Sequence, residues 1–321
     1  MSYADARFKE TCRDILENGT STQGQNVRAK WADGSFAYTF KKSCVCDEYD
    51  LRKEFPALTL RKVFLKSCMD EILWIYQRKS NNIGELKPHI WDSWADENGS
   101  IGKAYGYQIR QKFIFKKIKG LDNFHMELSK VSNFFGPKEP LPSATFCFDN
   151  ETMEYLLYLD QMDSVLYMLK FEPFNRRIMT NTWNFNDLSE MGLQPCAYNM
   201  LFSVEKDKSS DKLILNGLLM QRSQDMLAAN GWNVCQYAIF LMMVAQVSDM
   251  VPGKFVHVIN DCHIYDKHVP MIEELLKREE FDAPKVSLNP EIKNFYKFTT
   301  DDLNIEDYKF GEQIKNIPVA I

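Results

Sequence analysis

The sequence lacks an apolar run long enough to cross a membrane. Its longest, Tyr237 to Val247, is shorter than the roughly 20 residues that a transmembrane helix needs, so we predict that it forms a buried helix. Charged side chains are scattered through the first 20 residues, and we therefore expect no secretory signal there. These absences predict a cytoplasmic protein.

An excess of basic residues is also missing. Lysine and arginine number 39 against 44 aspartates and glutamates, a net charge of −5, whereas a surface that binds nucleic acid needs a basic face. The one dense basic cluster, Lys112 to Lys119, alternates with apolar residues at its start. That pattern fits a strand with a solvated face, and nucleic-acid binding there is the lesser alternative. We expect neither a nucleic-acid nor a membrane partner.

Disulfide and metal-binding patterns are absent as well. The eight cysteines lie in a long chain that we expect to remain in a reducing compartment, so free thiols are the better interpretation. Cys44 and Cys46 could form half of a metal site, but no second closely spaced Cys or His pair follows to complete four ligands. The sequence therefore predicts no metal.

What the sequence contains is a globular composition, with 45% hydrophobic and 26% charged residues, enough for a substantial core. Helical and alternating apolar patterns follow one another without regular β-α-β repetition, which favours the α+β class. Helical patterns cover residues 3–16, 58–77, 153–170, 237–247 and 268–278; strand patterns cover 178–183, 197–204, 213–221 and 255–259, and a hairpin is expected within 26–46 around Asp33-Gly34.

Residues 111–150 differ from the rest of the chain. They are rich in Phe and Lys, contain Gly136-Pro137 and Pro140-Leu141-Pro142, and repeat nothing found elsewhere. We interpret them as an insertion in a single domain that spans residues 1–321.

Taken by itself, Cys196 is one thiol among eight, most of which we expect to be packing residues. A thiolate nucleophile needs nearby positive charge to depress its pKa. Arg176-Arg177 precedes one predicted strand and Arg222-Ser223 ends another, and arginines beside a hydroxyl suit a phosphomonoester. The alternative for such arginines is a solvated position on the surface.

Two further features allow more than one interpretation. Asp261, His263 and Tyr265 share one alternating face after a predicted strand, where they would make only an incomplete metal site. Glu71 lies among apolar residues in a predicted helix. It is either a carboxylate buried for proton transfer or a helix residue that reaches solvent, and the residues alone favour the second.

Long motifs follow one another along the chain. In order, they are Asp70-Glu71-Ile72-Leu73-Trp74, then His89-Ile90-Trp91-Asp92-Ser93-Trp94-Ala95-Asp96-Glu97-Asn98-Gly99, Tyr105-Gly106-Tyr107-Gln108, Asn175-Arg176-Arg177-Ile178, Leu193-Gln194-Pro195-Cys196, Gln221-Arg222-Ser223-Gln224-Asp225, Asn233, Asp261-Cys262-His263-Ile264-Tyr265 and Pro318-Val319-Ala320-Ile321. With these motifs the chain resembles the thymidylate synthases over about residues 3–110 and 155–321. The insertion at 111–150 is atypical of that family.

The resemblance implies an α+β fold in which a large twisted mixed sheet with flanking helices packs back-to-back against its copy in a symmetric homodimer. It also implies a site for the phosphate of deoxyuridylate (dUMP). Arg28, Arg222 and Ser223 would bind that phosphate within their own subunit, while Arg176 and Arg177 would complete the site of the partner subunit.

The implied reaction is the reductive methylation of dUMP to thymidylate (dTMP), in which 5,10-methylenetetrahydrofolate gives one carbon and a hydride and leaves as dihydrofolate. Cys196, whose thiolate Arg222 would favour, would add to carbon 6 of the uracil and make carbon 5 nucleophilic. Glu71 would handle protons at the ring oxygen and the cofactor nitrogen, and Tyr105 would help to remove the carbon 5 proton.

Further residues are implied in recognition. Asn233 would accept a hydrogen bond from the uracil ring N–H and donate one to the neighbouring carbonyl, a pattern that cytosine reverses. Trp91 would protect the reductive step from water, which favours methylation over hydroxymethylation. The resemblance further assigns Gln221, Asp225, His263 and Tyr265 to dUMP, the latter two at the ribose hydroxyl; it assigns Ile90, Trp91, Arg61, Asp225, Ala320 and Ile321 to the folate, and counts Arg222, Asp225 and Asn233 with the catalytic residues.

Several positions depart from the family pattern. Ala197 replaces a common His after the nucleophile, Ala229 and Asn260 replace glycines, Arg61 replaces a Lys, and Asn230-Gly231-Trp232 replaces a Leu-Pro-Phe type of sequence. These departures bear on kinetic parameters and on the preference for the folate tail more than on the type of reaction. One alternative function is a dUMP or dCMP hydroxymethylase of the same fold. Another is a non-catalytic homologue that binds nucleotides or RNA.

Overall fold

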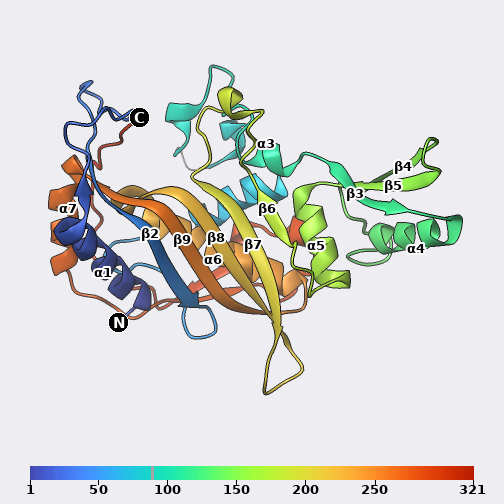
Figure 1. Ribbon diagram of the computed structural model, residues 1–321. Coiled ribbons are helices and arrows are strands. Elements are labelled where there is room, and N and C mark those ends of the chain that lie inside the picture. Colours follow the sequence, from blue (N-terminus) through green and yellow to red (C-terminus); the bar gives the residue numbers. More distant parts are fainter. Residues whose placement is uncertain (88–89) are drawn as a thin grey trace.

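The computed structural model describes residues 1–87 and 90–321, so His89 of the motifs above lies outside the described residues. Its main element is a six-stranded sheet in the order β1-β2-β9-β8-β7-β6 (Figure 1). β8 and β9 run parallel, and the other neighbouring strands are antiparallel. The strands are β1 (Thr20–Ser21), β2 (Thr39–Asp50), β6 (Met179–Asn181), β7 (Ala197–Lys206), β8 (Leu213–Asp225) and β9 (Val251–Tyr265).

Helices pack against one face of this sheet. α1 (Tyr3–Asn18) contacts β2 and β9, whereas α6 (Gly231–Val247) contacts β8 and β9 and carries α2 (Leu65–Ile72) on its far side. α7 (Val269–Lys277) lies beside α1 (Figure 1).

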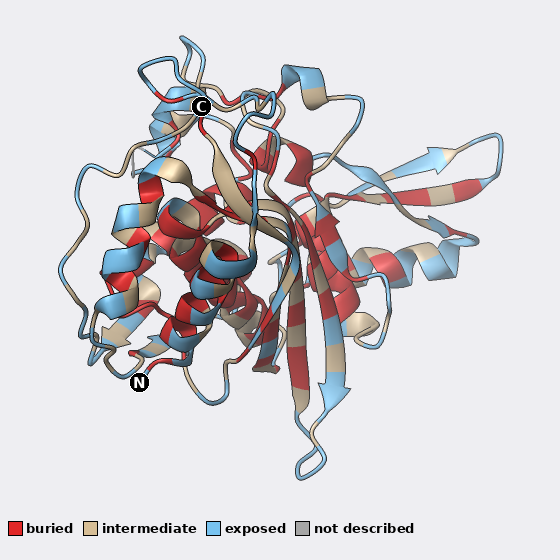
Figure 2. Cartoon of the chain, turned by 60° about the vertical axis from the view of Figure 1, so that its left-hand side comes forward, coloured by how far each residue is buried: buried red, intermediate tan, exposed pale blue. Residues whose placement is uncertain are grey.

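The opposite face of the sheet carries apolar side chains that the chain leaves partly exposed. Leu218 and Met220 of β8 lie next to Val256 and Val258 of β9, and all four are half-buried, whereas the residues that alternate with them are buried (Figure 2). Burial of one face only is typical of a sheet that uses its second face for another layer or another subunit.

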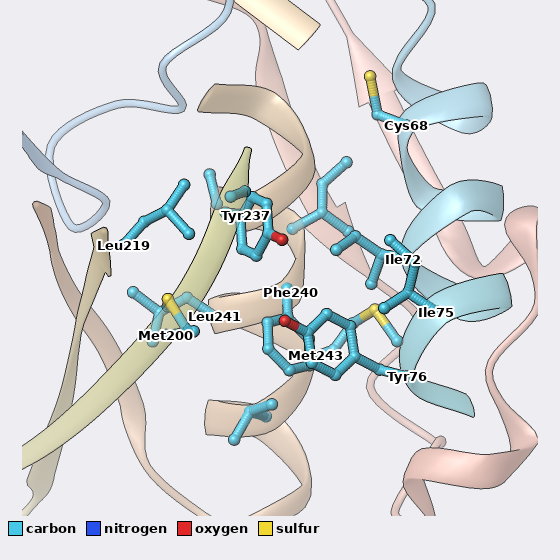
Figure 3. Packing of buried hydrophobic residues seen from close by; sticks show 14 of the residues in the cluster. Cys68, Ile72, Ile75, Tyr76, Met200, Leu219, Tyr237, Phe240, Leu241 and Met243 are labelled. Atoms are coloured by element: carbon cyan, nitrogen blue, oxygen red, sulfur yellow. The ribbon is translucent and has the colours of Figure 1, made fainter. Parts of the chain in front are cut away.

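The core lies between the sheet and the helices (Figure 3). Tyr76, which follows α2, stacks on Phe240 of α6 with 4.0 Å between ring centroids. Met200 and Leu219 approach Leu241 of α6 from the strands, and all three are fully buried. Each such side chain contributes about 1.5–3 kcal/mol through burial. This packing confirms the predicted buried helix at 237–247.

One stretch, Met226–Val247, is long and apolar enough to cross a membrane by length and composition alone. However, 72% of its most apolar window is buried inside the protein. Because a core helix passes the same test, the packing around α6 accounts for this composition.

The segment 111–150 builds most of a small module that projects from the body (Figure 1). Its three strands pair antiparallel in the order β3-β5-β4. Phe124 stacks on Tyr155 with 4.2 Å between ring centroids, which fixes the helix of the module to its sheet. The elements are β3 (Phe113–Ile118), α4 (Leu121–Ser132), β4 (Thr145–Asp149) and β5 (Glu154–Leu159), and α5 (Gln161–Phe171) returns the chain to the body.

Most predicted elements are confirmed, but three are wrong in part. Residues 154–159 form the central strand of the module rather than the first turns of a helix, because that apolar run is buried on both faces and therefore lacks the alternation of a half-buried strand. The helix predicted from residue 58 begins only at Leu65. Around Asp33-Gly34 the hairpin is reduced to one bridge between Lys30 and Phe36. The remaining short elements are α3 (Gly106–Ile109), β10 (Lys285–Leu288) and β11 (Leu303–Glu306).

Candidate active site

Cys196 lies immediately before β7, and its backbone is fixed from two sides. Its N–H donates to the Tyr105 hydroxyl oxygen at 3.1 Å, and its carbonyl accepts from the N–H of Arg222 at 2.9 Å. The Arg222 guanidinium donates to the carbonyls of Pro195 (3.0 Å) and Gln194 (2.8 Å). The turn that carries the thiol is therefore tied to a tyrosine and an arginine from two other segments.

The environment of this thiol is less favourable to ionisation than the sequence suggested. Burial raises the pKa of the Cys196 thiol, and the positive charges of Arg222 and Arg28 only partly offset the rise. Arg222 acts in the direction that the resemblance implies, toward the thiolate, but desolvation has the larger effect on the pKa.

Tyr105 has a backbone conformation that few residues other than glycine adopt. Its φ is 44° and its ψ is −104°, and a conformation of this kind costs on the order of 1–3 kcal/mol. The buried ring packs on Trp91 with 5.1 Å between centroids. Such strain is concentrated at functional sites, and here it accompanies the contact between the hydroxyl and Cys196.

Glu71 is buried between two indole rings. Its Oε1 accepts from Trp91 Nε1 at 2.9 Å and its Oε2 from Trp232 Nε1 at 2.6 Å. Burial raises the pKa of Glu71 to about 7, although these hydrogen bonds act in the opposite direction. The helix becomes π-helical over Leu73–Gln77, directly after this residue, a distortion that is frequent at functional sites. A carboxyl group with a pKa near neutrality suits proton transfer.

The ends of β8 and β9 place several candidate ligands side by side. Because the strands are parallel, Ser223 and Asp225 pair with Asp261 and His263. His263 Nδ1 lies 2.9 Å from Asp261 Oδ1, whereas its buried Nε2 has no hydrogen-bond partner among the described residues. The ring of Tyr265 is 4.9 Å from that of His263. A buried ring nitrogen without a partner suits a ligand hydroxyl.

Asp225 begins a second π-helical turn, Met226–Asn230. Its Oδ1 accepts from the N–H groups of Leu227 (2.9 Å) and Ala228 (3.2 Å) and lies 3.4 Å from His268 Nδ1. Burial alone would raise the pKa of Asp225, but His268 and the other partners outweigh it and lower the pKa. Asp225 is therefore an ionised carboxylate at neutral pH.

The C-terminal residues lie against the loop that follows β1 (Figure 1). Ile321 donates from its N–H to the carbonyl of Lys30 at 3.0 Å, and Lys30 N–H donates to the carbonyl of Ile321 at 2.9 Å. His268 Nε2 lies 2.8 Å from the carbonyl oxygen of Pro318. Since Arg28 is two residues before Lys30 in the sequence, one loop carries a candidate phosphate ligand and holds the chain end.

The sequence model of the thymidylate synthase family matches residues 6–321. The chain belongs to the thymidylate synthase family. It is 35% identical over 318 residues to thymidylate synthase 1 of Bacillus spizizenii and to the thymidylate synthase of Bacillus phage phi3T, with 98% of each chain covered. The thymidylate synthase of Bacillus atrophaeus is 34% identical over 264 residues, which are 81% of this chain and 97% of that relative.

A solved structure gives the same result. The thermostable thymidylate synthase A from Bacillus subtilis matches with a TM-score of 0.80 and 33% identity, and the match covers 99% of both chains. The α+β fold predicted from the resemblance, with a mixed sheet and flanking helices, is thereby confirmed.

Other residues that the thymidylate synthase resemblance assigns to the folate lie in different environments. Trp91 is buried, Ile90 is exposed and Ala320 is half-buried. Arg61 does not face solvent, where the glutamate tail of a folate was expected. It is 9% exposed, and its guanidinium donates to the carbonyl of Leu227. Burial lowers the pKa of Arg61, and the nearby charge of Asp225 opposes this effect. Arg61 therefore forms part of the wall behind Asp225.

The structure does not bring Arg176 and Arg177 to Cys196. Both arginines are exposed and precede β6. The carbonyl of the next residue, Ile178, accepts from the N–H of Phe202, six residues along β7 from Cys196. At about 3.3 Å per residue, the separation is about 20 Å, which exceeds the length of an arginine side chain. Within one chain, the set of arginines predicted for the phosphate is therefore incomplete.

Glu71 should make the stability of the protein fall as the pH rises. Its folded-state pKa of about 7 lies above the ordinary glutamate value of 4.5, so its favourable contribution is complete below about pH 4.5 and is lost as the pH rises through 7. At 1.36 kcal/mol per pKa unit, the loss is about 3 kcal/mol. Urea denaturation at pH 5 and pH 8 should show this loss in the wild type and not in Glu71→Gln.

The exposed Glu273→Gln variant is the control, because it should keep the pH dependence of the wild type. Equal pH dependence in Glu71→Gln and the wild type would show that the burial of Glu71 does not raise its pKa.

Proposed function

We propose that this protein is a thymidylate synthase, which converts dUMP and 5,10-methylenetetrahydrofolate into dTMP and dihydrofolate. One observation carries the proposal. In a chain of this family, Cys196 is held by Tyr105 and Arg222, while Trp91 contacts both Tyr105 and the buried Glu71. A nucleophile, a phenol and a carboxyl group able to exchange protons near neutral pH therefore surround one site.

In the proposed reaction, Cys196 Sγ forms a bond to carbon 6 of the uracil, and the displaced ring electrons make carbon 5 nucleophilic. The folate supplies the methylene carbon and then a hydride. Glu71 exchanges protons at the ring oxygen and the folate nitrogen, since its pKa of about 7 permits both states. Tyr105 assists removal of the carbon 5 proton, and the bond to Cys196 breaks when dTMP forms.

The nucleotide is proposed to bind across the ends of β8 and β9. Arg28, Arg222 and Ser223 bind the phosphate as charge-assisted and hydroxyl donors. The unpaired Nε2 of His263, with Tyr265 beside it, receives the ribose hydroxyl. Gln221 and Asn233, whose side chains are 3.3 Å apart, face the uracil edge.

The folate is proposed to bind beside the nucleotide, between Asp225 and the chain end. Asp225 is an ionised acceptor for ring N–H groups, and Trp91 offers an indole that is already fixed by Glu71. Ile90, Ala320 and Ile321 add apolar contacts. Arg61 remains the proposed partner of the carboxylates in the folate tail, a role that requires its guanidinium to leave the carbonyl of Leu227.

A homodimer follows from two observations. The sheet face around Leu218, Met220, Val256 and Val258 is apolar and only half-buried, and Arg176-Arg177 lies too far from Cys196 to serve the site of its own chain. We propose that two copies pack through these sheet faces and that each donates its arginine pair to the phosphate site of the other.

The whole chain is proposed to form one cytoplasmic catalytic domain that contains the segment 111–150 as an insertion. The match to thymidylate synthase 1 of Bacillus spizizenii covers 98% of both chains, so the proposed insertion would be shared with that relative.

A spectrophotometric assay tests the function. Purified protein given dUMP and methylenetetrahydrofolate should produce dihydrofolate, with its rise in absorbance, and an equal amount of dTMP. A hydroxymethylated nucleotide formed without dihydrofolate would identify the hydroxymethylase alternative instead. Binding of nucleotide or RNA with no turnover would identify the non-catalytic alternative.

Asn233→Asp should shift nucleotide preference toward dCMP. A protonated carboxyl group donates to the cytosine ring nitrogen and accepts from the exocyclic amine, which is the pattern that the carboxamide lacks in its present orientation. We expect the ratio of kcat/KM for dUMP to that for dCMP to fall by about 100-fold or more, because sites that hydrogen-bond a substrate discriminate strongly. An unchanged ratio would contradict the assignment of Asn233 to the pyrimidine edge.

A further inference from the structure

His257, in β9, is fully buried and has no part in the reaction proposed above. Its Nε2 lies 2.8 Å from Gln221 Oε1, and no described residue makes a hydrogen bond to its Nδ1. An amide oxygen only accepts, so the imidazole proton is on Nε2 and Nδ1 keeps its lone pair. Burial lowers the pKa of His257 to about 3, so that the ring is neutral and this tautomer persists at neutral pH.

Gln221 is held in one orientation by its neighbours. Its Nε2 donates to the carbonyl of Ser223 at 2.9 Å and to Asn233 Oδ1 at 3.3 Å. If the amide rotated by half a turn, its oxygen would face the carbonyl oxygen of Ser223, and its N–H groups would face the N–H of His257. The contact with the Ser223 carbonyl would become repulsive, and the contact with His257 would be kept only if the imidazole proton moved from Nε2 to Nδ1.

The order of donors and acceptors continues from Gln221 toward Glu71. Asn233 Nδ2 donates to Gln236 Oε1 at 3.1 Å. The buried Nε2 of Gln236 has no acceptor with hydrogen-bond geometry among the described residues, and the Gln236 amide stabilises the Glu71 carboxylate. Four side chains therefore point their donors in one direction, from the Nε2 of His257 toward the Glu71 carboxyl group.

This order decides which pyrimidine fits. Uracil presents N–H next to C=O, whereas cytosine presents a bare ring nitrogen next to NH₂. A carboxamide that rotates freely can exchange its oxygen and its NH₂ group, and it therefore forms hydrogen bonds with either base. Asn233 selects uracil only if its oxygen and nitrogen cannot exchange places. We propose that His257 is a positioning residue that fixes the amide of Gln221, and through it the amide of Asn233, in the orientation that accepts uracil and rejects cytosine. The proposal rests on the proposed function.

The test measures dissociation constants for dUMP and dCMP by calorimetry, in the absence of folate. His257→Phe keeps an aromatic ring but removes the donor. We expect it to lower the preference for dUMP over dCMP by about tenfold, which is the effect of one net hydrogen bond. His257→Gln places an amide N–H near the former Nε2 and should restore most of the preference. His125→Phe, at an exposed position of α4, should leave both dissociation constants unchanged.

A double-mutant comparison tests whether His257 acts on Asn233 through Gln221. If His257 acts through Gln221, then His257→Phe should have no further effect on the preference in a Gln221→Leu background. Additive effects, or a loss of affinity that is equal for both nucleotides in His257→Phe, would show that the substitution merely loosens the core and would overturn the proposal.

The two hypotheses can fail separately. A wild-type protein that binds dUMP in preference to dCMP but forms no dihydrofolate would contradict the proposed function and leave the binding comparison valid. A wild-type protein that forms dihydrofolate while His257→Phe keeps the full preference for dUMP would contradict only the role of His257.

Discussion

Cys196→Ser is expected to reduce the formation of dTMP by at least about 10³-fold, because a serine hydroxyl is far less nucleophilic than a thiol. The rise in dihydrofolate absorbance measures this loss. The substitution leaves the backbone contacts of residue 196 with Tyr105 and Arg222 available, so dUMP should still bind. The result would therefore separate loss of the nucleophile from loss of the site.

A second measurement examines the covalent bond itself. Fluorine at carbon 5 of dUMP replaces the proton that has to leave, so the adduct with the protein should accumulate in the presence of methylenetetrahydrofolate. Mass spectrometry should find it on the wild type and on Cys147→Ser, an exposed control thiol, and not on Cys196→Ser. Turnover retained by Cys196→Ser, or an adduct on another residue, would remove Cys196 from the mechanism.

Most strands of the main sheet could be predicted from their short apolar or alternating runs, and α6 from an apolar run that is too long for a strand. β5 could not, since Glu154–Leu159 is buried on both faces and a short run of that kind fits a helix equally well. The π-helical turns after Glu71 and Asp225 were not predictable either, because an extra residue in a helical turn leaves no signal in hydrophobic spacing.

The candidate site also contains residues that the sequence predicts and residues that it does not. The order of the motifs in the sequence indicates most of the site residues. It marks Trp232 only as a departure from the family pattern, and it gives no role to His257 or His268. Trp232 contacts Glu71, which is 161 residues away in the sequence, and His268 contacts Pro318 across 50 residues. No local pattern predicts such pairs. The only sign in the sequence is a polar side-chain N–H group, such as that of Trp232, within an apolar segment. Such a group needs a hydrogen-bond acceptor, but the sequence does not indicate which residue supplies it.

The Cys196 thiol illustrates a further limit of sequence reasoning. Counting arginines near the motif predicted a stabilised thiolate, but the depth of burial depends on the whole fold, and burial proved the larger influence on the pKa.

An impaired variant, Arg176→Ala, and an inactive one, Cys196→Ala, should together recover activity when they share a dimer. A site needs Cys196 from one chain and, in our proposal, Arg176 from the other, because about 20 Å of strand separates them within a chain. Arg176→Ala alone should lower kcat/KM for dUMP by roughly 10- to 100-fold, the effect of losing one charge-assisted hydrogen bond to phosphate. Cys196→Ala alone should be inactive.

Refolding equal amounts of Arg176→Ala and Cys196→Ala together should make half of the dimers mixed, and one of the two sites in each mixed dimer would be complete. Activity at low dUMP concentration should then rise to roughly one quarter of the wild-type value. Arg222→Ala mixed with Cys196→Ala is the matched control, because Arg222 contacts the turn of Cys196 in the same chain, and no mixed dimer of these two variants has a complete site. Recovery in the control but not in the first mixture would place Arg222, rather than Arg176, in the partner's site. Recovery in neither would show that Arg176 and Arg177, which precede β6, are not shared between subunits.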